Sequence, residues 1–99
     1  MSFEIRFTDA AREHLRAMTA RERSIVLSEV EVELAHEPAI PSRKRRPMRP
    51  NLLAEWELRL GNFRAYYRIM EDEAKYVEIV AVGIKQREQI WIGGERIEL

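Results

Sequence analysis

A β-hairpin is predicted by the run Trp56-Glu57-Leu58-Arg59-Leu60-Gly61-Asn62-Phe63-Arg64-Ala65-Tyr66-Tyr67-Arg68-Ile69. Apolar residues alternate with polar ones on both sides of Gly61-Asn62, which is the period of two half-buried strands. A glycine in first position suits a two-residue turn, and such a turn sets the register of the strands. The resulting pairs are Leu60 with Phe63, Arg59 with Arg64, Leu58 with Ala65, Glu57 with Tyr66, Trp56 with Tyr67 and Glu55 with Arg68.

The residues before this hairpin predict a strand and two helices. Phe3 to Phe7 alternates apolar with charged residues, which is the period of a half-buried strand. Thr8 can cap a short helix that runs to about Met18. The Thr19-x-x-Glu22 spacing is a capping box, so a second helix begins there and stops before Pro38.

The residues after the hairpin predict a central strand and a small final element. Residues 76–82 are apolar on both faces, which is typical of a strand with neighbours on both sides and cover on both faces. Residues 89–99 favour a short hairpin about Gly93-Gly94, with a short helix over residues 85–91 as the alternative. The whole pattern predicts one α+β domain over residues 1–99, with the helix pair on an antiparallel sheet of about four strands.

The composition limits the classes of function. The chain has 99 residues, no cysteine and a net charge of zero, which excludes disulfides and thiolate metal sites and argues against strong non-specific nucleic-acid binding. The N-terminus has neither the basic start nor the apolar run of a signal peptide. We therefore expect a cytoplasmic protein.

The positive charge is concentrated in the middle of the chain. Residues 43–70 carry 8 basic and 2 acidic residues, and all four prolines lie between positions 38 and 50. Regular structure is not expected in that proline-rich segment. Its basic residues predict an RNA or phosphate partner, and a solvated loop is the alternative reading. They are Arg43, Lys44, Arg45, Arg46 and Arg49.

The predicted register also places Arg59 directly opposite Arg64, and like charges in such a pair repel each other. A bound phosphate between the two guanidinium groups would offset that repulsion. Neutralisation by Glu57 and Glu55 would do so equally well. The two histidines, His14 and His36, are expected on helix surfaces.

The order of elements and two motifs resemble the RelE/ParE superfamily of toxins from bacterial type II toxin–antitoxin pairs. The hairpin Trp56 to Ile69 is similar to the family's "LR…G.(Y/F)R..Y" motif. The run Ile79-Val80-Ala81-Val82-Gly83-Ile84-Lys85 is similar to its "(I/V).VG.(K/R)" strand end. The resemblance covers nearly the whole chain and implies a RelE-like fold.

In the RelE branch the resemblance implies an endoribonuclease that cleaves messenger RNA on the ribosome and inhibits translation without metal or cofactor. The expected catalytic residues are Arg64, Lys85, Glu57 and Arg59. Glu57 and Glu55 stand where the best-known RelE enzymes carry lysines, and Trp91 stands where they carry a tyrosine; Glu57 would then be the base. Further RNA or phosphate contacts are expected from Arg68, Tyr66 and Arg87, besides the basic residues of the proline-rich segment.

Two other readings remain open within the same superfamily. A ParE-like toxin would inhibit DNA gyrase without cutting RNA, and a non-toxic member would only bind the antitoxin. In every case the resemblance implies a cognate antitoxin protein as partner. The apolar tail residues Ile90, Trp91 and Ile92 are the surface on which we expect it to bind.

Overall fold

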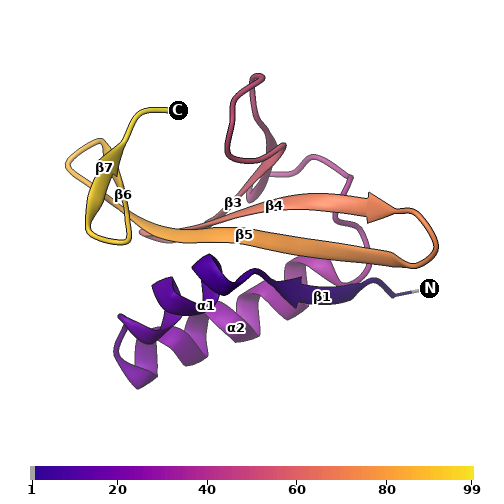
Figure 1. The fold of residues 1–99 in the computed structure, drawn as a ribbon, viewed down its shortest axis with the longest axis horizontal. Coiled ribbons are helices and arrows are strands. Elements are labelled where there is room, and N and C mark those ends of the chain that lie inside the picture. Colours follow the sequence, from indigo (N-terminus) through magenta and orange to yellow (C-terminus); the bar gives the residue numbers. More distant parts are fainter. Residues whose placement is uncertain (1) are drawn as a thin grey trace.

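Two helices lie against one face of a curved sheet in the computed structural model, which describes residues 2–99 (Figure 1). The α+β class predicted from the sequence, with a pair of helices packed on a sheet, is confirmed. The sheet has seven strands within the described residues rather than about four. The elements are β1 (Glu4–Phe7), α1 (Asp9–Arg16), α2 (Ala20–Leu34), β2 (Arg45–Pro47), β3 (Trp56–Leu60), β4 (Phe63–Glu71), β5 (Lys75–Gln86), β6 (Gln89–Ile92) and β7 (Glu95–Ile97).

The β3–β4 hairpin has the predicted register from the Leu60–Phe63 pair to the Trp56–Tyr67 pair. Gly61 has a φ of 62°, the left-handed conformation that a glycine in the first turn position allows. On the helix side of the sheet, the rings of Trp56 and Tyr67 stack with centroids 5.8 Å apart. The period-two pattern therefore determined which side chains face the helices.

Strand β1 corrects the expectation of a wholly antiparallel sheet, because it pairs with β5 in parallel, Glu4 with Tyr76 through Phe7 with Ile79. A parallel pair needs a long crossover connection between its strands. The two helices and the following strands supply that crossover, and Figure 1 shows β1 running beside β5 on the side of the helices.

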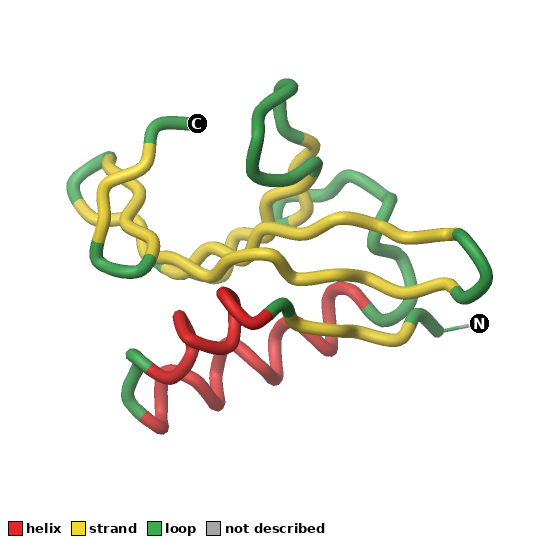
Figure 2. The backbone as a smooth tube through the Cα atoms, viewed as in Figure 1, coloured by secondary structure: helices red, strands yellow, loops and turns green. Residues whose placement is uncertain are grey.

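One further expectation about local structure is wrong, and one alternative is excluded. The proline-rich segment contains β2, which pairs with β3 as Arg45 with Leu58 and Pro47 with Trp56. Proline is tolerated there because β2 is an edge strand. At the other end of the chain, residues 85–91 form no helix: β5 extends to Gln86 and β6 begins at Gln89, and Figure 2 shows the strands in yellow and the turn between them in green. The final hairpin about Gly93-Gly94 is confirmed.

The core lies between the helices and the sheet. Both predicted caps are present: the Thr8 side chain accepts from the Ala11 N–H, and Thr19 and Glu22 form the capping box. One face of α2 is buried against β3, β4 and β5; the buried side chains are Val26, Val30, Leu34, Leu58, Tyr67, Val77 and Ile79. Within residues 2–99, no helix has the length and apolar character needed to cross a membrane.

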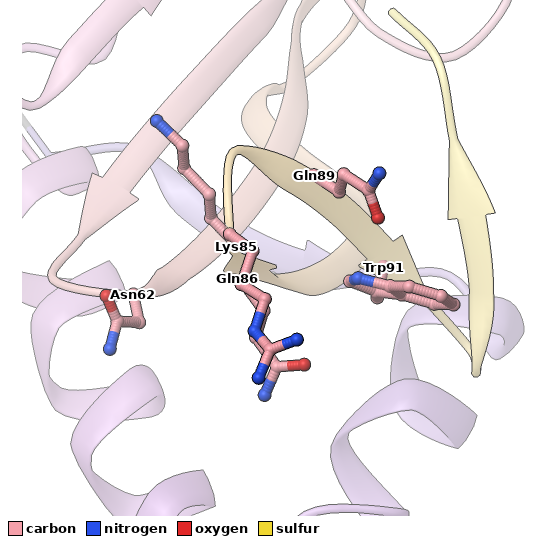
Figure 3. A pocket seen from close by; sticks show the side chains of 6 residues that line it. Asn62, Lys85, Gln86, Gln89 and Trp91 are labelled. Carbon is pink, nitrogen blue, oxygen red and sulfur yellow. The ribbon is translucent and has the colours of Figure 1, made fainter.

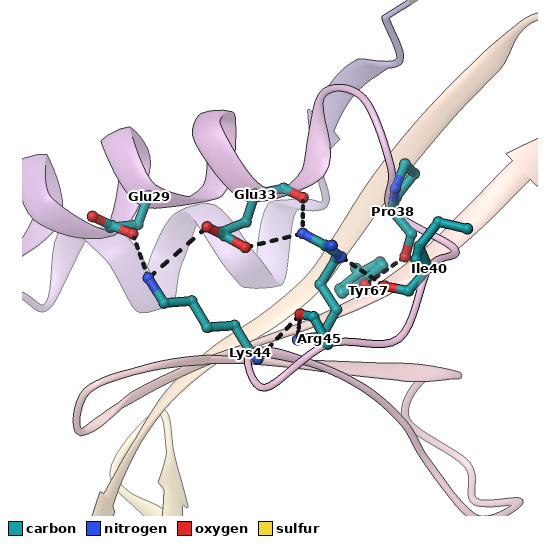
Figure 4. A network of polar contacts seen from close by, with 8 residues as sticks. Glu29, Glu33, Pro38, Ile40, Lys44, Arg45 and Tyr67 are labelled. Carbon is teal, nitrogen blue, oxygen red and sulfur yellow. Dashed lines mark hydrogen bonds and ion pairs between the residues drawn. The ribbon is translucent and has the colours of Figure 1, made fainter.

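The hydroxyl of Tyr67 fastens the segment after α2 to the sheet. It is fully buried and donates to the carbonyl oxygen of Pro38 at 2.8 Å (Figure 4). This bond holds the segment after α2 against β4, and the bond from Arg45 to the Ile40 carbonyl holds the same segment near β2.

Changing Tyr67 to Phe should lower the free energy of unfolding by about 1 to 2 kcal/mol, because the Pro38 carbonyl would stay buried without a donor. Urea denaturation followed by circular dichroism measures the loss. Tyr76→Phe is the control, since that half-buried ring keeps its contact with Arg6. An equal loss in both variants would contradict a specific role of the Tyr67–Pro38 bond.

Candidate functional site

Four polar side chains gather on the sheet face that points away from the helices. Leu58, Ala65 and Tyr67 face the helices, so alternation places the intervening residues of β3 and β4 on the open face. We call these residues the Glu57 cluster: Glu57, Arg59, Arg64 and Tyr66.

The Glu57 carboxylate is the centre of this cluster. The Arg59 Nε lies 2.9 Å from one of its oxygens. The Tyr66 hydroxyl donates to the other oxygen at 3.1 Å, and the Arg64 Nε lies 4.0 Å from it. Glu57 thus offsets the repulsion between the two opposed arginines, which is the second of the two arrangements that the sequence left open.

Arg64 and Tyr66 are the buried members of the cluster. Arg64 is only 7% exposed, and its Nη1 donates to the carbonyl oxygens of Gly61 and Phe63 at 2.7 and 2.8 Å. Tyr66 is fully buried, and burial, with the nearby Glu57 charge, raises the pKa of its hydroxyl above the ordinary value. Tyr66 therefore stays protonated and donates to Glu57.

Two more cations belong to the open face. Arg46 of β2 pairs with Glu57 in register, and Lys85 follows two residues after Gly83, the partner of Arg64. The Lys85 Nζ lies 3.4 Å from a carboxylate oxygen of Glu88. Two cavities, of about 430 and 230 Å³, both have Glu57 in their walls, and the Glu57 side chain is 14% exposed.

The basic residues of the proline-rich segment are divided between two environments. Lys44 Nζ lies 3.3 Å from a carboxylate oxygen of Glu29, and Arg45 Nη1 lies 3.0 Å from one of Glu33 (Figure 4). Arg45 also donates to the Ile40 carbonyl, and its side chain is only 14% exposed. These two cations therefore bind helix α2. Arg43, Arg46, Arg49 and Arg68 are exposed. Of these four, Arg46 and Arg49 line a cavity with Glu57, and Arg68 lines the neighbouring one with Arg49.

The tail residues proposed for antitoxin binding lie on different faces. Ile90 and Ile92 pack with Tyr66 on the open side of the sheet. Trp91 pairs with Ile84 and lines an apolar hollow of about 340 Å³ on the helix side, together with Met18 and Phe63. Trp91 is therefore on the opposite face from Glu57.

A cavity of about 580 Å³ lies at the end of the sheet, where the β3–β4 and β5–β6 turns lie (Figure 3). It brings together the predicted residues Lys85, Arg87 and Trp91. It adds three amide side chains that the sequence did not single out, because isolated amides carry no pattern. They are Asn62, Gln86 and Gln89.

The β5–β6 turn holds two non-glycine residues in the left-handed region. Arg87 has a φ of 51° and Glu88 a φ of 66°. A two-residue turn of this kind strongly favours Asn-Gly, and the left-handed conformation costs a residue with a Cβ roughly 1 to 2 kcal/mol. Asn and Gly at positions 87 and 88 would therefore give a less strained turn than Arg and Glu do.

His14 corrects the expectation of a surface histidine. Its Nδ1 accepts a hydrogen bond from the backbone N–H of Val82 at 3.1 Å, which joins α1 to the middle of β5. Burial lowers the pKa of His14 below its ordinary 6.5. The bond requires a neutral ring, because a protonated Nδ1 cannot accept. His36 is exposed, as predicted, although it lies beyond the end of α2.

The His14 bond predicts a loss of stability in mild acid. The unfolded chain takes up a proton near pH 6.5, whereas the folded chain takes it up only at lower pH. The free energy of unfolding should therefore fall as pH drops below about 6.5. The slope of this free energy against pH should correspond to the uptake of at most one proton on unfolding. Urea titrations between pH 5 and 7.5 measure it. His14→Gln should remove this slope and His36→Gln should keep it; an unchanged slope in the first variant would contradict the assignment.

The described residues 2–99 contain no cluster of three or more histidine, aspartate or glutamate side chains suited to a metal ion.

One protein family and one solved structure are similar to this chain over most of its length. The family model described as the ParE toxin of the type II toxin–antitoxin system, parDE, matches residues 5–89. The curated proteins gave no match. A crystal structure of the RelBE2 toxin–antitoxin complex from Mycobacterium tuberculosis contains a similar chain, with a TM-score of 0.68 and 30% identity, covering 86% of this chain and 100% of that one.

Proposed function

The chain belongs to the ParE toxin family of type II toxin–antitoxin systems, and from this premise we propose that the toxin cleaves messenger RNA on the ribosome without a metal ion. The observation that carries the proposal is the Glu57 carboxylate between the Arg59 and Arg64 guanidinium groups on an open sheet face.

Cleavage through the 2′-hydroxyl needs a base, positive charge around the transition state and an acid for the leaving oxygen. Glu57 would take the proton of the hydroxyl. Arg64 would stabilise the charge on the phosphate, since two backbone carbonyls already hold its guanidinium in place. Lys85, which lies on the same face by register, would act as the acid that donates a proton to the leaving oxygen.

The cluster has room to change partners when RNA arrives. The Arg59–Glu57 ion pair involves a half-exposed guanidinium, and such pairs contribute little to stability. A phosphate can therefore replace Glu57 as the partner of Arg59 at low cost, which would leave the carboxylate free to act as base. The exposed Arg46, Arg49 and Arg68 would hold the neighbouring phosphates.

Inhibition of DNA gyrase by binding alone is the second candidate. It is favoured by the side chain of Arg64, which is 9% exposed and has backbone acceptors without any substrate. It is also favoured by Trp91, an indole that cannot act as an acid and that lies on the other face.

Glu57→Gln separates the two candidates. If Glu57 is the base, the amide should slow cleavage on translating ribosomes by a factor of roughly 10² to 10⁴, while an amide oxygen still accepts from Tyr66 and keeps the fold. Glu73→Gln is the matched control, since it makes the same change of charge in the exposed β4–β5 turn. Mapping of RNA 5′ ends measures the rate.

An unchanged rate in Glu57→Gln would exclude Glu57 as the base. If the folded wild-type chain cuts no RNA on ribosomes, the nuclease proposal fails. Inhibition of gyrase supercoiling by the same preparation would then support the second candidate.

The antitoxin is proposed to bind the apolar hollow beside Trp91. This hollow lies between the end of α1 and strands β5 and β6, and Met18, Phe63 and Ile84 share its wall. An apolar segment of the antitoxin would bury these half-exposed side chains. Ile90 and Ile92, which pack within the toxin itself, would support Trp91 rather than contact the antitoxin.

Met18→Asp should weaken antitoxin binding by about 30-fold or more, the scale of a central interface residue. Calorimetric titration with the cognate antitoxin measures the affinity, and circular dichroism checks the fold. Val32→Asp is the control, because Val32 is 70% exposed on α2 and is not among the residues that line the hollow. Equal affinity in both variants would place the antitoxin elsewhere.

A further inference from the structure

Within residues 2–99, His14 of α1 has a hydrogen-bond partner for one ring nitrogen only. Its Nδ1 accepts from the Val82 N–H at 3.1 Å, so the proton of the neutral ring lies on Nε2. No buried side-chain nitrogen or oxygen in the same range lacks a partner, so the Nε2–H group is accessible to solvent. The Val82 bond therefore fixes both the tautomer of the ring and the direction of its free donor.

The free donor lies in the wall of the apolar hollow. His14 lines this hollow of about 340 Å³ together with Met18, Trp91, Gly93 and Gly94, where the end of α1 meets β5 and the β6–β7 hairpin (Figure 1). The Nε2 edge of the ring faces Gly93, since a Cβ at that position would lie 3.4 Å from the His14 Nε2. The two glycines have no side chain, so a polypeptide main chain can approach the imidazole here.

The donor limits what can fill the hollow. An occupant with only apolar groups would bury the Nε2–H without an acceptor, which weakens binding by about tenfold or more. An occupant with an oxygen at that point keeps the hydrogen bond. Of the described residues that line the hollow, only Glu22 is charged, and its carboxylate disfavours a second carboxylate nearby. The matching acceptor is therefore a neutral oxygen.

We propose that the hollow binds an extended segment of the antitoxin, in which one main-chain carbonyl oxygen accepts from the His14 Nε2–H. The inference rests on the proposed antitoxin site and adds the polar contact that fixes the register of the segment. The carbonyls inside a helix are already bonded within the helix, whereas an extended segment leaves carbonyls free. An apolar side chain beside that carbonyl would pack on Met18 and Trp91.

Two substitutions at His14 separate the free donor from the Val82 bond. In His14→Asn the amide oxygen takes the place of Nδ1 and accepts from Val82, but no group reaches the place of Nε2. In His14→Gln the amide nitrogen takes the place of Nε2 and can donate into the hollow, but the acceptor for Val82 is lost. Calorimetric titration with the antitoxin should show about tenfold weaker binding for His14→Asn and binding within about threefold of the wild type for His14→Gln.

The reverse order of affinities would overturn the proposal, because it would show that His14 acts only through its bond to Val82. Equal affinities of the two variants would overturn it as well. Circular dichroism checks that both variants are folded at the temperature of the titration.

NMR of the ring nitrogens observes the bond directly in the full ¹⁵N-labelled chain. Addition of the antitoxin at neutral pH should slow the exchange of the His14 Nε2 proton with water by about tenfold or more. The exposed His36 is the internal control, and its ring signals should not change. Unchanged exchange at His14 in the complex would overturn the proposal.

Glu22→Gln tests the chemistry of the acceptor. The amide oxygen still accepts from the Thr19 N–H, so the capping box is kept while the negative charge is removed. With a main-chain carbonyl as acceptor, the affinity should stay within about threefold of the wild type, as in the control Glu31→Gln on the exposed side of α2. Binding about tenfold tighter in Glu22→Gln alone would assign the acceptor to an antitoxin carboxylate and overturn the main-chain assignment.

Failure of the antitoxin site itself has a different signature. If Met18→Asp leaves the affinity unchanged, the antitoxin binds elsewhere and both proposals fail. If Met18→Asp weakens binding while His14→Asn does not, the hollow is the antitoxin site and only the His14 contact fails.

Discussion

The structure depends on the hydrogen bonding of one strand, β5. It pairs with β4 through residues 75–84, with β1 through residues 76–79 and with β6 through residues 83–86. The pairing with β1 attaches the N-terminal strand and, through it, the helices; the pairing with β6 attaches the C-terminal hairpin. Gly83 makes the pairing with β6 possible, because a Cβ there would lie 2.6 Å from the Trp91 carbonyl oxygen and 2.8 Å from the Ile92 Cγ1. A residue with a side chain at position 83 would push β6 away from the sheet.

Because side chains alternate across this sheet, its two faces carry different sets of residues. One face is closed by the helices and supplies the core, in which Tyr67 and Ile79 are fully buried. The other face carries the Glu57 cluster, with Arg46 and Lys85 on the same side by register. Trp91 belongs to the first face and Lys85 to the second, although they are only six residues apart. Residues that are close in sequence can therefore lie on opposite faces of the sheet.

The same alternation explains why the basic segment does not act as one surface. Arg45 lies opposite Leu58 and faces α2, where its guanidinium group forms an ion pair with the Glu33 carboxylate. Arg46 lies opposite Glu57 and faces the open side. A partly buried ion pair such as Arg45–Glu33 fixes the segment in place only because further acceptors, among them the Ile40 carbonyl, complete its hydrogen bonding. Charge in this segment thus holds the fold together as well as offering contacts to a phosphate.

The sequence by itself determined the α+β class, the two capped helices, the register of the β3–β4 hairpin and the pairing of Arg59 with Arg64, because caps, turns and period-two alternation act between residues close in the chain. It also determined that Glu57, Arg59, Arg64 and Tyr66 share one face. Only the tertiary structure decided the parallel pairing of β1, the presence of β2, the ion pairs of Lys44 and Arg45 with α2, the His14–Val82 bond and the separation of Trp91 from Glu57. Each of these joins segments distant in sequence, and their geometry follows from how β5 brings several strands together.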